Sequence, residues 1–318
     1  MSKVRWGIIS AGRISHTFAK DMAYANNAEI KAVAARNGES AQKFAEQYKI
    51  EKAYEGYDAI FNDPEIDAVY ISTPHSLHFE QTQQALHAGK HVLCEKPFTV
   101  SPEQCIELTQ LATDKELFLM EAMWTYFLPA IKQAQDWVEQ GKIGELKHIK
   151  ADFGYPMPYT PESREWNTSL GGGCLLDMGV YPIAFNWLFT QREPVSSYVT
   201  GERAPNGADK DVTIIYDYGR VKSVLGTSFQ CRLRNWAYLI GTEGYIAIPD
   251  FFRASNAQLH VLDNLIDEFE DHRLGSGFEY QIEAASKAIL NGELETREMP
   301  LSHTLAFQQQ MANALSKF

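Results

Sequence analysis

The sequence predicts a doubly wound parallel α/β sheet followed by an α+β domain with an open, mostly antiparallel sheet. Strand and helix patterns alternate through the first half, a glycine-containing turn follows the first apolar run, and short strands with hairpin turns fill the second half. At 318 residues and 36.0 kDa, the chain is about twice the size of a typical domain. We therefore expect two domains, 1–123 and 124–318.

The first half alternates between buried strands and amphipathic helices. This alternation predicts right-handed crossovers and a parallel sheet covered on both faces. Helical patterns separate the apolar runs, which are Val4–Ser10, Ile30–Ala35, Ala68–Ser72, His91–Cys94 and Leu117–Glu121.

The first turn is a degenerate form of a phosphate-binding turn. Its three glycine positions read Ser10, Gly12 and Ser15, so the glycine that permits close backbone approach remains. The surrounding alternation favours a dinucleotide-binding Rossmann domain over an ordinary strand-to-helix turn. We expect the turn to contact the cofactor through Ser10, Gly12, Arg13 and Ile14.

Arg36 indicates which nicotinamide cofactor is bound. It ends the second apolar run, 24 residues beyond Gly12, where an acidic residue usually binds the adenosine ribose. An arginine at that place accommodates a 2′-phosphate, so the sequence favours NADP, with NAD possible. The alternative is a solvated surface arginine.

Polar motifs follow three of the expected strands, at the sheet edge where ligands bind. Thr73, Pro74, His75 and His78 follow one strand, Glu95-Lys96-Pro97 the next, and Glu121-Ala122-Met123-Trp124 the last. His75 and His78 have the spacing of a metal pair but lack carboxylate partners, so we expect a loop lining the cofactor and no metal. Pro97 fixes the backbone beside Lys96, whose alternative role is a surface salt bridge to Glu95.

A second constellation follows the Gly171-Gly172-Gly173 loop. Asp177 and Tyr181 are four residues apart in a segment, Leu175–Leu188, with helical apolar spacing. Both would project from one face and reach one ligand together, with Gly179 and Pro182 distorting the helix nearby. The alternative is a buried tyrosine satisfied by a nearby acid.

These motifs together resemble the glucose-fructose oxidoreductase and inositol dehydrogenase family across nearly the whole chain. The segment Glu121–Phe127 looks like the branch that contains dimeric dihydrodiol dehydrogenases and NADP-dependent xylose dehydrogenases. The resemblance implies a nicotinamide-dependent oxidoreductase, and relatives often have a cis Lys-Pro bond at the motif corresponding to Lys96-Pro97. Lys96 matches the lysine that touches substrate and nicotinamide, Tyr181 the proton donor, and Asp177 the substrate-orienting acid.

Two positions depart from the family pattern. Ser10 replaces a usual glycine, which the turn should tolerate, and Tyr126 replaces the branch's common arginine, which leaves the substrate open.

The expected reaction needs a proton acceptor, since a hydroxyl proton must leave when a carbinol carbon gives up a hydride. A free tyrosine titrates at pKa ~10 and a lysine at ~10.4, so a Lys96 cation beside Tyr181 would favour the phenolate. We therefore expect Tyr181 to be the general acid/base, with Lys96 and Asp177 completing the catalytic group across the domain junction.

After a helix at Ala130–Gln140, the second half consists largely of short strands joined by hairpins. The turns at Asp217–Arg220 and Gly241–Gly244 predict antiparallel pairing, with one sheet face free to form a homodimer or higher homo-oligomer. Helices at Phe278–Leu290 and Leu301–Ser316 close the chain, and the last helix could pack on the first domain. Most aromatic residues should be core, and the expected substrate contacts are Trp124, Tyr126, Phe153, Arg164 and Asn167.

Composition excludes several classes of protein. A net charge of −12 argues against nucleic-acid binding, and no apolar stretch reaches membrane-spanning length. The four cysteines form no CxxC pair and the N-terminal segment lacks a signal-peptide core, so we expect a cytoplasmic protein.

The leading functional hypothesis is an NADP-preferring dehydrogenase or reductase acting on CH–OH groups of a sugar, polyol or cyclic diol. The alternatives are a non-catalytic NADP-binding sensor of the same fold and a reductase of a non-sugar carbonyl.

Overall fold

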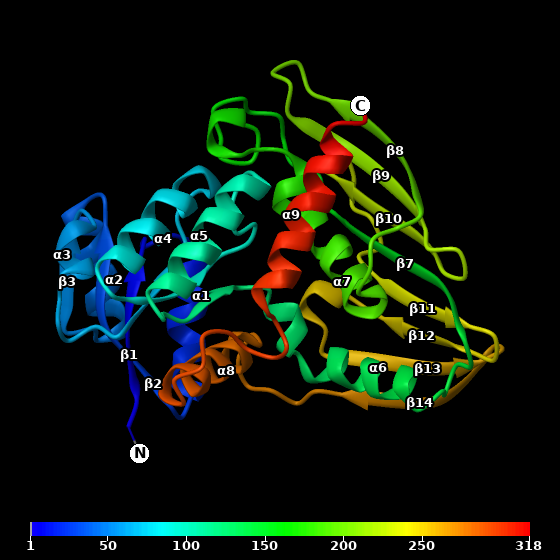
Figure 1. Ribbon diagram of the computed structural model, residues 1–318, viewed down its shortest axis with the longest axis horizontal. Helices are drawn as coiled ribbons and strands as arrows, with labels where there is room; N and C mark the ends of the chain where they lie inside the picture. Colours follow the sequence, from blue (N-terminus) through cyan, green and yellow to red (C-terminus); the bar gives the residue numbers. More distant parts are fainter. Residues whose placement is uncertain (1) are drawn as a thin grey trace. The chain divides into compact units, whose positions relative to one another are not determined.

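The computed structural model describes residues 2–318, and the chain divides into two compact units (Figure 1). The first unit runs to Trp124 and includes Leu274–Leu305, and the second comprises Thr125–Arg273 and Ala306–Phe318. The first boundary lies one residue beyond the expected one. The expected second domain, 124–318, is corrected by this division, because the segment Leu274–Leu305 belongs with the first unit.

The sheet of the first unit is parallel throughout, as predicted. Its strand order is β3-β2-β1-β4-β5-β6, so the chain changes direction across the sheet between β1 and β4. Such a switch point is where open α/β sheets bind ligands. The strands are β1 Val4–Ile9, β2 Ala28–Ala35, β3 Lys52–Glu55, β4 Ala68–Ile71, β5 His91–Cys94 and β6 Leu119–Glu121.

Among residues 2–318, six α-helices lie wholly in the first unit. α8 comes from the C-terminal part of the chain and packs on α1, β1 and β2, where Trp6 Nε1 donates to Ser286 Oγ at 3.0 Å. The Asp21 carboxylate accepts from the amides of Ser276 and Phe278, which fixes the start of α8. The helices are α1 Arg13–Asp21, α2 Gly38–Tyr48, α3 Asp58–Phe61, α4 His78–His87, α5 Pro102–Asp114 and α8 Phe278–Leu290.

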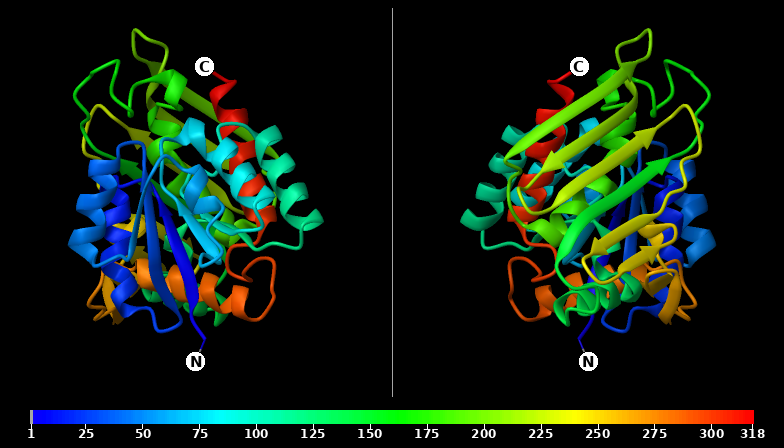
Figure 2. Two further views of the ribbon diagram at one scale, coloured as in Figure 1. Left: turned by 90° about the vertical axis from the view of Figure 1, so that its left-hand side faces the viewer. Right: turned by 90° about the vertical axis from the view of Figure 1, so that its right-hand side faces the viewer.

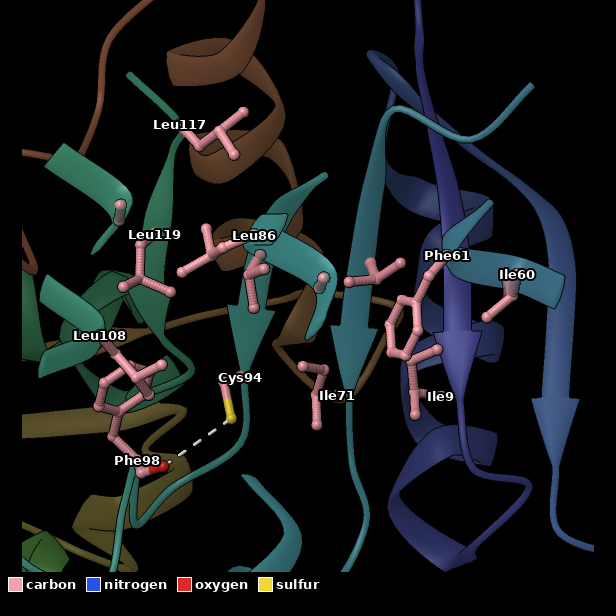
Figure 3. Close-up of a cluster of buried hydrophobic side chains, with 14 of the residues drawn as sticks. Ile9, Ile60, Phe61, Ile71, Leu86, Cys94, Phe98, Leu108, Leu117 and Leu119 are labelled. Carbon is pink, nitrogen blue, oxygen red and sulfur yellow. Dashed lines mark hydrogen bonds between the residues drawn. The ribbon is translucent and has the colours of Figure 1, made fainter. Parts of the chain in front are cut away.

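An apolar cluster binds the helices of this unit to its sheet (Figure 3). Leu86 of α4 and Leu108 of α5 pack with strand residues such as Ile71 and Cys94, all buried. Burial raises the pKa of the Cys94 thiol well above its usual value, so this cysteine is an apolar core residue. The strand ends above this cluster are therefore supported by a rigid core.

The second unit has an eight-stranded, mostly antiparallel sheet, as predicted. Its order is β14-β13-β12-β11-β7-β10-β9-β8, and among the described strands β7 pairs with β10 in parallel while the other neighbours pair antiparallel. The strands are β7 Leu146–Gly154, β8 Ser196–Arg203, β9 Asp209–Asp217, β10 Lys222–Ser228, β11 Ala237–Gly241, β12 Tyr245–Ile248, β13 Asn256–Val261 and β14 Asn264–Glu270.

Helices cover one face of this second sheet. α6 (Pro129–Glu139) contacts β13 and β14, and α7 (Val180–Thr190) contacts β7 and β10. The right view of Figure 2 looks onto the opposite face, where no helix crosses the strands. The last helix, α9 (Leu301–Leu315), begins in the first unit and continues in the second.

Candidate active site

The turn after β1 presents a helix N-terminus. Gly12 is the N-cap of α1, no side chain caps the helix, and its first turn contains no acidic residue. Ser10 has φ of 102°, a conformation that favours glycine, and its Oγ accepts from the Gly12 amide at 3.1 Å. A helix N-terminus without a side-chain cap leaves N–H groups for an anion, so the turn fits a cofactor pyrophosphate.

Serine hydroxyls join this turn to the end of β4. Ser15 Oγ lies 2.8 Å from Ser72 Oγ, and Ser72 Oγ donates to the Ile9 carbonyl at 3.0 Å. The two strand ends that flank the switch point are therefore held together by the residue that replaces the third glycine.

Arg36 directly follows β2 and is exposed. Within residues 2–318, no acidic side chain forms an ion pair with it. Arg13 is also exposed and Ile14 is half-buried at the start of α1. A guanidinium in this place is available to a phosphate.

His78 supports the backbone of two loops. Its Nδ1 lies 2.9 Å from the Pro97 carbonyl oxygen and its Nε2 lies 2.8 Å from the Thr73 carbonyl oxygen. Both nitrogens can donate at once only in the doubly protonated ring. The side chain is fully buried, so His78 positions the backbone of these two loops, and its expected cofactor contact stays a prediction. His75 is buried as well.

Lys96 lies in a turn that is held by buried carboxyl groups. The Lys96-Pro97 bond is cis, as the family resemblance implies. Glu95 accepts from the Tyr70 hydroxyl at 2.6 Å, and Glu121 Oε1 accepts from the Phe98 amide at 3.0 Å. Burial raises the pKa of Glu121 to about 8, although the Phe98 amide offsets part of this rise.

In the second unit, Asp177 and Tyr181 lie on a distorted helical segment. Residues Leu175–Gly179 form a π-turn that leads into α7, so Asp177 is in the π-turn and Tyr181 is in the first turn of the α-helix. The distortion expected near Gly179 and Pro182 is thus present. π-turns within helices occur frequently at functional sites.

Arg164 forms an ion pair with Asp177. Its Nη1 lies 3.2 Å from Asp177 Oδ1, and its Nη2 lies 3.4 Å from Glu165 Oε1. Asp177 is largely buried, so the guanidinium stabilises its ionised form. Arg164 was expected to contact a substrate, and in the structure it contacts the acid that is expected to orient one.

Aromatic rings surround Tyr181 within the second unit. Phe153 meets its ring edge-on at a centroid distance of 5.4 Å, and Phe252 lies 5.9 Å away. Phe153 and Phe252 stack on each other at 4.0 Å. These contacts restrict the orientation of the tyrosine ring, and Phe252 was not singled out from the sequence.

The remaining expected substrate residues have different surroundings. Tyr126 is 1% exposed and its hydroxyl donates to the Ala184 carbonyl in α7 at 2.6 Å, and its expected substrate contact stays a prediction. Asn167 Oδ1 accepts from the amide and hydroxyl of Ser169, so its oxygen caps a turn. Trp124, in the first unit, packs against Phe278 at 4.7 Å.

Sequence reasoning missed Asp209, the first residue of β9. Its Oδ2 accepts from the Leu175 amide at 2.6 Å and from the Cys174 thiol at 3.3 Å. No motif in the sequence marks it, because the expected strand began at Val212 and the partners of Asp209 lie more than thirty residues earlier.

Comparison with known proteins assigns the family. Residues 4–123 match the model described as "Oxidoreductase family, NAD-binding Rossmann fold", and residues 131–247 match the GFO/IDH/MocA C-terminal domain. The chain belongs to the GFO/IDH/MocA oxidoreductase family. This membership confirms the family resemblance, the fold class and a nicotinamide-dependent oxidoreductase function.

Several relatives carry one name. The chain is 33% identical to trans-1,2-dihydrobenzene-1,2-diol dehydrogenase of Xenopus laevis over 98% of this chain and 97% of that protein. The Homo sapiens protein of the same name is 36% identical over 77% of this chain and 74% of its own length.

Solved structures agree on the fold. KijD10, a 3-ketoreductase from Actinomadura kijaniata solved with NADP and TDP-benzene, has a TM-score of 0.87 and 27% identity, covering 99% of this chain and 98% of its own. The aldose-aldose oxidoreductase from Caulobacter crescentus, with a TM-score of 0.89, 21% identity and the same coverage, supports the fold alone. Among residues 2–318, no helix is long and apolar enough to cross a membrane.

Proposed function

We propose that this member of the GFO/IDH/MocA family is an NADP-dependent dehydrogenase or reductase that acts on a CH–OH group of a sugar, polyol or cyclic diol. The observation that carries the proposal is that Asp177, in the π-turn, forms an ion pair with Arg164 and lies four residues before Tyr181 in the first turn of α7. An ionised acid and a phenol four residues apart provide one group to orient a hydroxyl and one to move its proton. The names of the dihydrodiol dehydrogenase relatives support this substrate class.

The residues would divide the chemistry as follows. A bound nicotinamide supplies or accepts the hydride. Tyr181 gives its phenolic proton to the developing alkoxide oxygen in reduction and takes the hydroxyl proton in oxidation. Asp177, which pairs with Arg164, would accept a hydrogen bond from a neighbouring substrate hydroxyl. Lys96, in the turn after β5, would contact the nicotinamide, as the family resemblance implies.

Turnover by the Tyr181→Phe variant tests this assignment. Oxidation of NADPH and reduction of NADP⁺ are measured across sugars, inositols, trans-1,2-dihydrobenzene-1,2-diol and dicarbonyls. We expect the variant to lose about 10²–10⁴-fold in kcat and to bind NADPH as the wild type does. Near-normal turnover of the variant would refute the role of Tyr181. Tight NADPH binding with no wild-type turnover on the panel would instead favour a cofactor sensor.

The cofactor preference rests on Arg36, because the exposed guanidinium after β2 has no acidic partner in the described chain. Arg36→Ala should weaken NADPH binding about 10-fold or more and leave NADH binding nearly unchanged, since NADH lacks the 2′-phosphate. An unchanged ratio of the two dissociation constants in titrations would contradict the NADP preference. Arg297→Ala is the matched control, because Arg297 is an exposed arginine of the same unit that no expectation places at the cofactor.

We also propose that the protein is a homodimer formed through the open face of the second sheet. Tyr198, Ile215 and Val224 lie side by side on β8, β9 and β10, and all three are exposed. A row of apolar side chains on an uncovered sheet face favours burial against a second copy.

We also propose a reducing, cytoplasmic location, which the four free cysteines support.

A further inference from the structure

The start of the π-turn is held by a carboxylate from a distant strand. Asp209 is 3% exposed, and its Oδ2 accepts from the Leu175 amide at 2.6 Å and from the Cys174 thiol at 3.3 Å. A helix start leaves backbone N–H groups without intrahelical partners, and a carboxylate is the strongest acceptor for them. Asp209 therefore fixes the residues at which the segment bearing Asp177 and Tyr181 begins.

The backbone before the π-turn is shaped to admit this carboxylate. Gly173 has φ of 135°, and a Cβ at that position would collide with the Asp209 carboxylate. The Gly173 carbonyl oxygen also accepts a hydrogen bond from the Asp177 amide at 3.2 Å. The glycine thus links Asp209 to Asp177 within a few atoms, and a side chain there would displace one or the other.

A second strand holds the same point from the other side. Thr227 of β10 donates its hydroxyl to the Cys174 carbonyl at 3.2 Å, so Cys174 is held between β9 and β10. Gly179 lies against Thr227 and Leu175, where a Cβ would meet Leu175 Cδ1 at 2.7 Å and Thr227 Cγ2 at 3.0 Å. The π-turn is therefore positioned along its length by the sheet.

We propose that Asp209 is a positioning residue for catalysis, which sets the placement of Asp177 and Tyr181 through the Leu175 amide. The proposal rests on the proposed function, because it assumes that Asp177 and Tyr181 act on the substrate. Burial raises the pKa of Asp209, and the Leu175 amide and Cys174 thiol oppose this rise, as expected for a carboxylate bound to donors.

The test compares Asp209→Ala, Asp209→Asn and Asp211→Asn. Asp211 lies two residues along the same strand and has no contact with the Leu175 amide, so its variant controls for loss of a nearby charge. A displaced acid/base group costs kcat, and we expect Asp209→Ala to lose about 10–100-fold in kcat for trans-1,2-dihydrobenzene-1,2-diol oxidation. NADPH affinity should stay within about twofold, because the Rossmann unit is untouched.

Asparagine keeps an oxygen that can accept from the Leu175 amide, so Asp209→Asn should recover most of the lost kcat. Asp211→Asn should turn over as the wild type does. A merely structural role would lower kcat, NADPH affinity and thermal stability together and would not be rescued by asparagine. Wild-type kcat in a folded Asp209→Ala variant would overturn the proposal.

Hydrogen exchange of the Leu175 amide gives a readout that does not depend on turnover. In the NADPH-bound protein, this amide should exchange faster in Asp209→Ala than in the wild type, with Asp209→Asn between them.

If the wild type shows no activity on the diol or the panel, the proposed function fails while exchange still tests the contact. If Tyr181→Phe is inactive and both Asp209 variants have wild-type kcat, only the present inference fails. If Asp209→Ala does not fold, exchange of the Leu175 amide decides, because it should be faster in Asp209→Asn than in Asp211→Asn, and equal rates would overturn the proposal.

Discussion

Ser10 occupies a position whose backbone conformation suits glycine, and its hydroxyl oxygen accepts a hydrogen bond from the Gly12 amide. Its φ of 102° costs about 1–3 kcal/mol for a residue with a Cβ. Removing the hydroxyl frees the Gly12 N–H for the cofactor pyrophosphate. Hydrogen bonds to charged groups exceed neutral ones by about 1 kcal/mol, so Ser10→Gly should bind NADPH about fivefold tighter.

Ser10→Ala separates the two effects of this substitution. It also frees the Gly12 amide, so it should bind NADPH more tightly than the wild type, yet it keeps the positive φ and loses the serine hydrogen bond. We expect it to be less stable than Ser10→Gly by about 1 kcal/mol or more in denaturant titrations. Weaker NADPH binding in both variants would show instead that the hydroxyl itself contacts the cofactor.

Glu121 makes the stability of the protein depend on pH. Its pKa is about 8 in the folded protein and 4.5 in an unfolded chain, so the folded protein keeps the proton between these values. The folded state then binds more protons than the unfolded state, and the free energy of unfolding falls as pH rises from about 4.5 to about 8. The contribution of protonated Glu121 to the free energy of unfolding is fully present below about pH 4.5 and is lost as the pH rises through about 8.

Glu121→Gln should remove this dependence. Glutamine is neutral and keeps an oxygen for the Phe98 amide, so the variant should match the wild type near pH 5. At pH 8 it should be more stable by roughly 3–5 kcal/mol, measured as the difference between denaturant unfolding curves. Glu107→Gln, an exposed change on α5, should leave the wild-type slope intact. Equal pH dependence in Glu121→Gln and wild type would show that Glu121 is ionised throughout.

At the scale of elements, the sequence predicts those whose burial is periodic. α8 was expected at Phe278–Leu290 and lies there, because its apolar spacing is helical over its whole length. β3 and β14 were not expected, since both are edge strands without an alternating burial pattern: β3 is mostly half-buried and β14 mostly exposed. Edge strands form through backbone pairing with a neighbour, which a single segment does not reveal.

The candidate site was predictable where chemistry coincides with a strand end or a helical spacing. Lys96 and Asp177 were singled out this way and stay predictions, while the expected distortion near Gly179 and Pro182 is present as the π-turn. The π-turn hydrogen bonding and the role of Asp209 were not predictable, because they depend on the placement of β9 beside the start of the segment. The hydrogen bonds of Tyr126 and His78 to backbone carbonyls were not predictable either, because their partners Ala184 and Pro97 are brought near only by the fold.

At the scale of the whole molecule, the division of the chain into units was the least predictable feature. Leu274–Leu305 belongs with the first unit because α8 packs on α1 and Trp6 Nε1 donates to Ser286. An amphipathic helix shows that one face is buried but does not identify the surface that covers it. The order of elements along the chain therefore predicts the type of each sheet, but it does not predict the unit on which a late helix such as α8 packs.

The proposed dimer is also a property of the whole molecule, and a charge on the open sheet face tests it. Tyr198, Ile215 and Val224 are 64%, 40% and 40% exposed in the isolated chain, so Ile215→Lys should not disturb its folding. In a twofold-symmetric dimer the same substitution enters the interface from both copies, placing two uncompensated charges in an apolar surface.

We expect sedimentation velocity to give a dimer for the wild type and a monomer for Ile215→Lys. The thermal unfolding of the Ile215→Lys monomer should match that of the wild-type monomer. Leu262→Lys, an exposed apolar position after β13, should remain dimeric. A dimer that persists in Ile215→Lys would place the contact on another surface, because a lysine ammonium at the centre of this row has no carboxylate opposite it on β8 or β10.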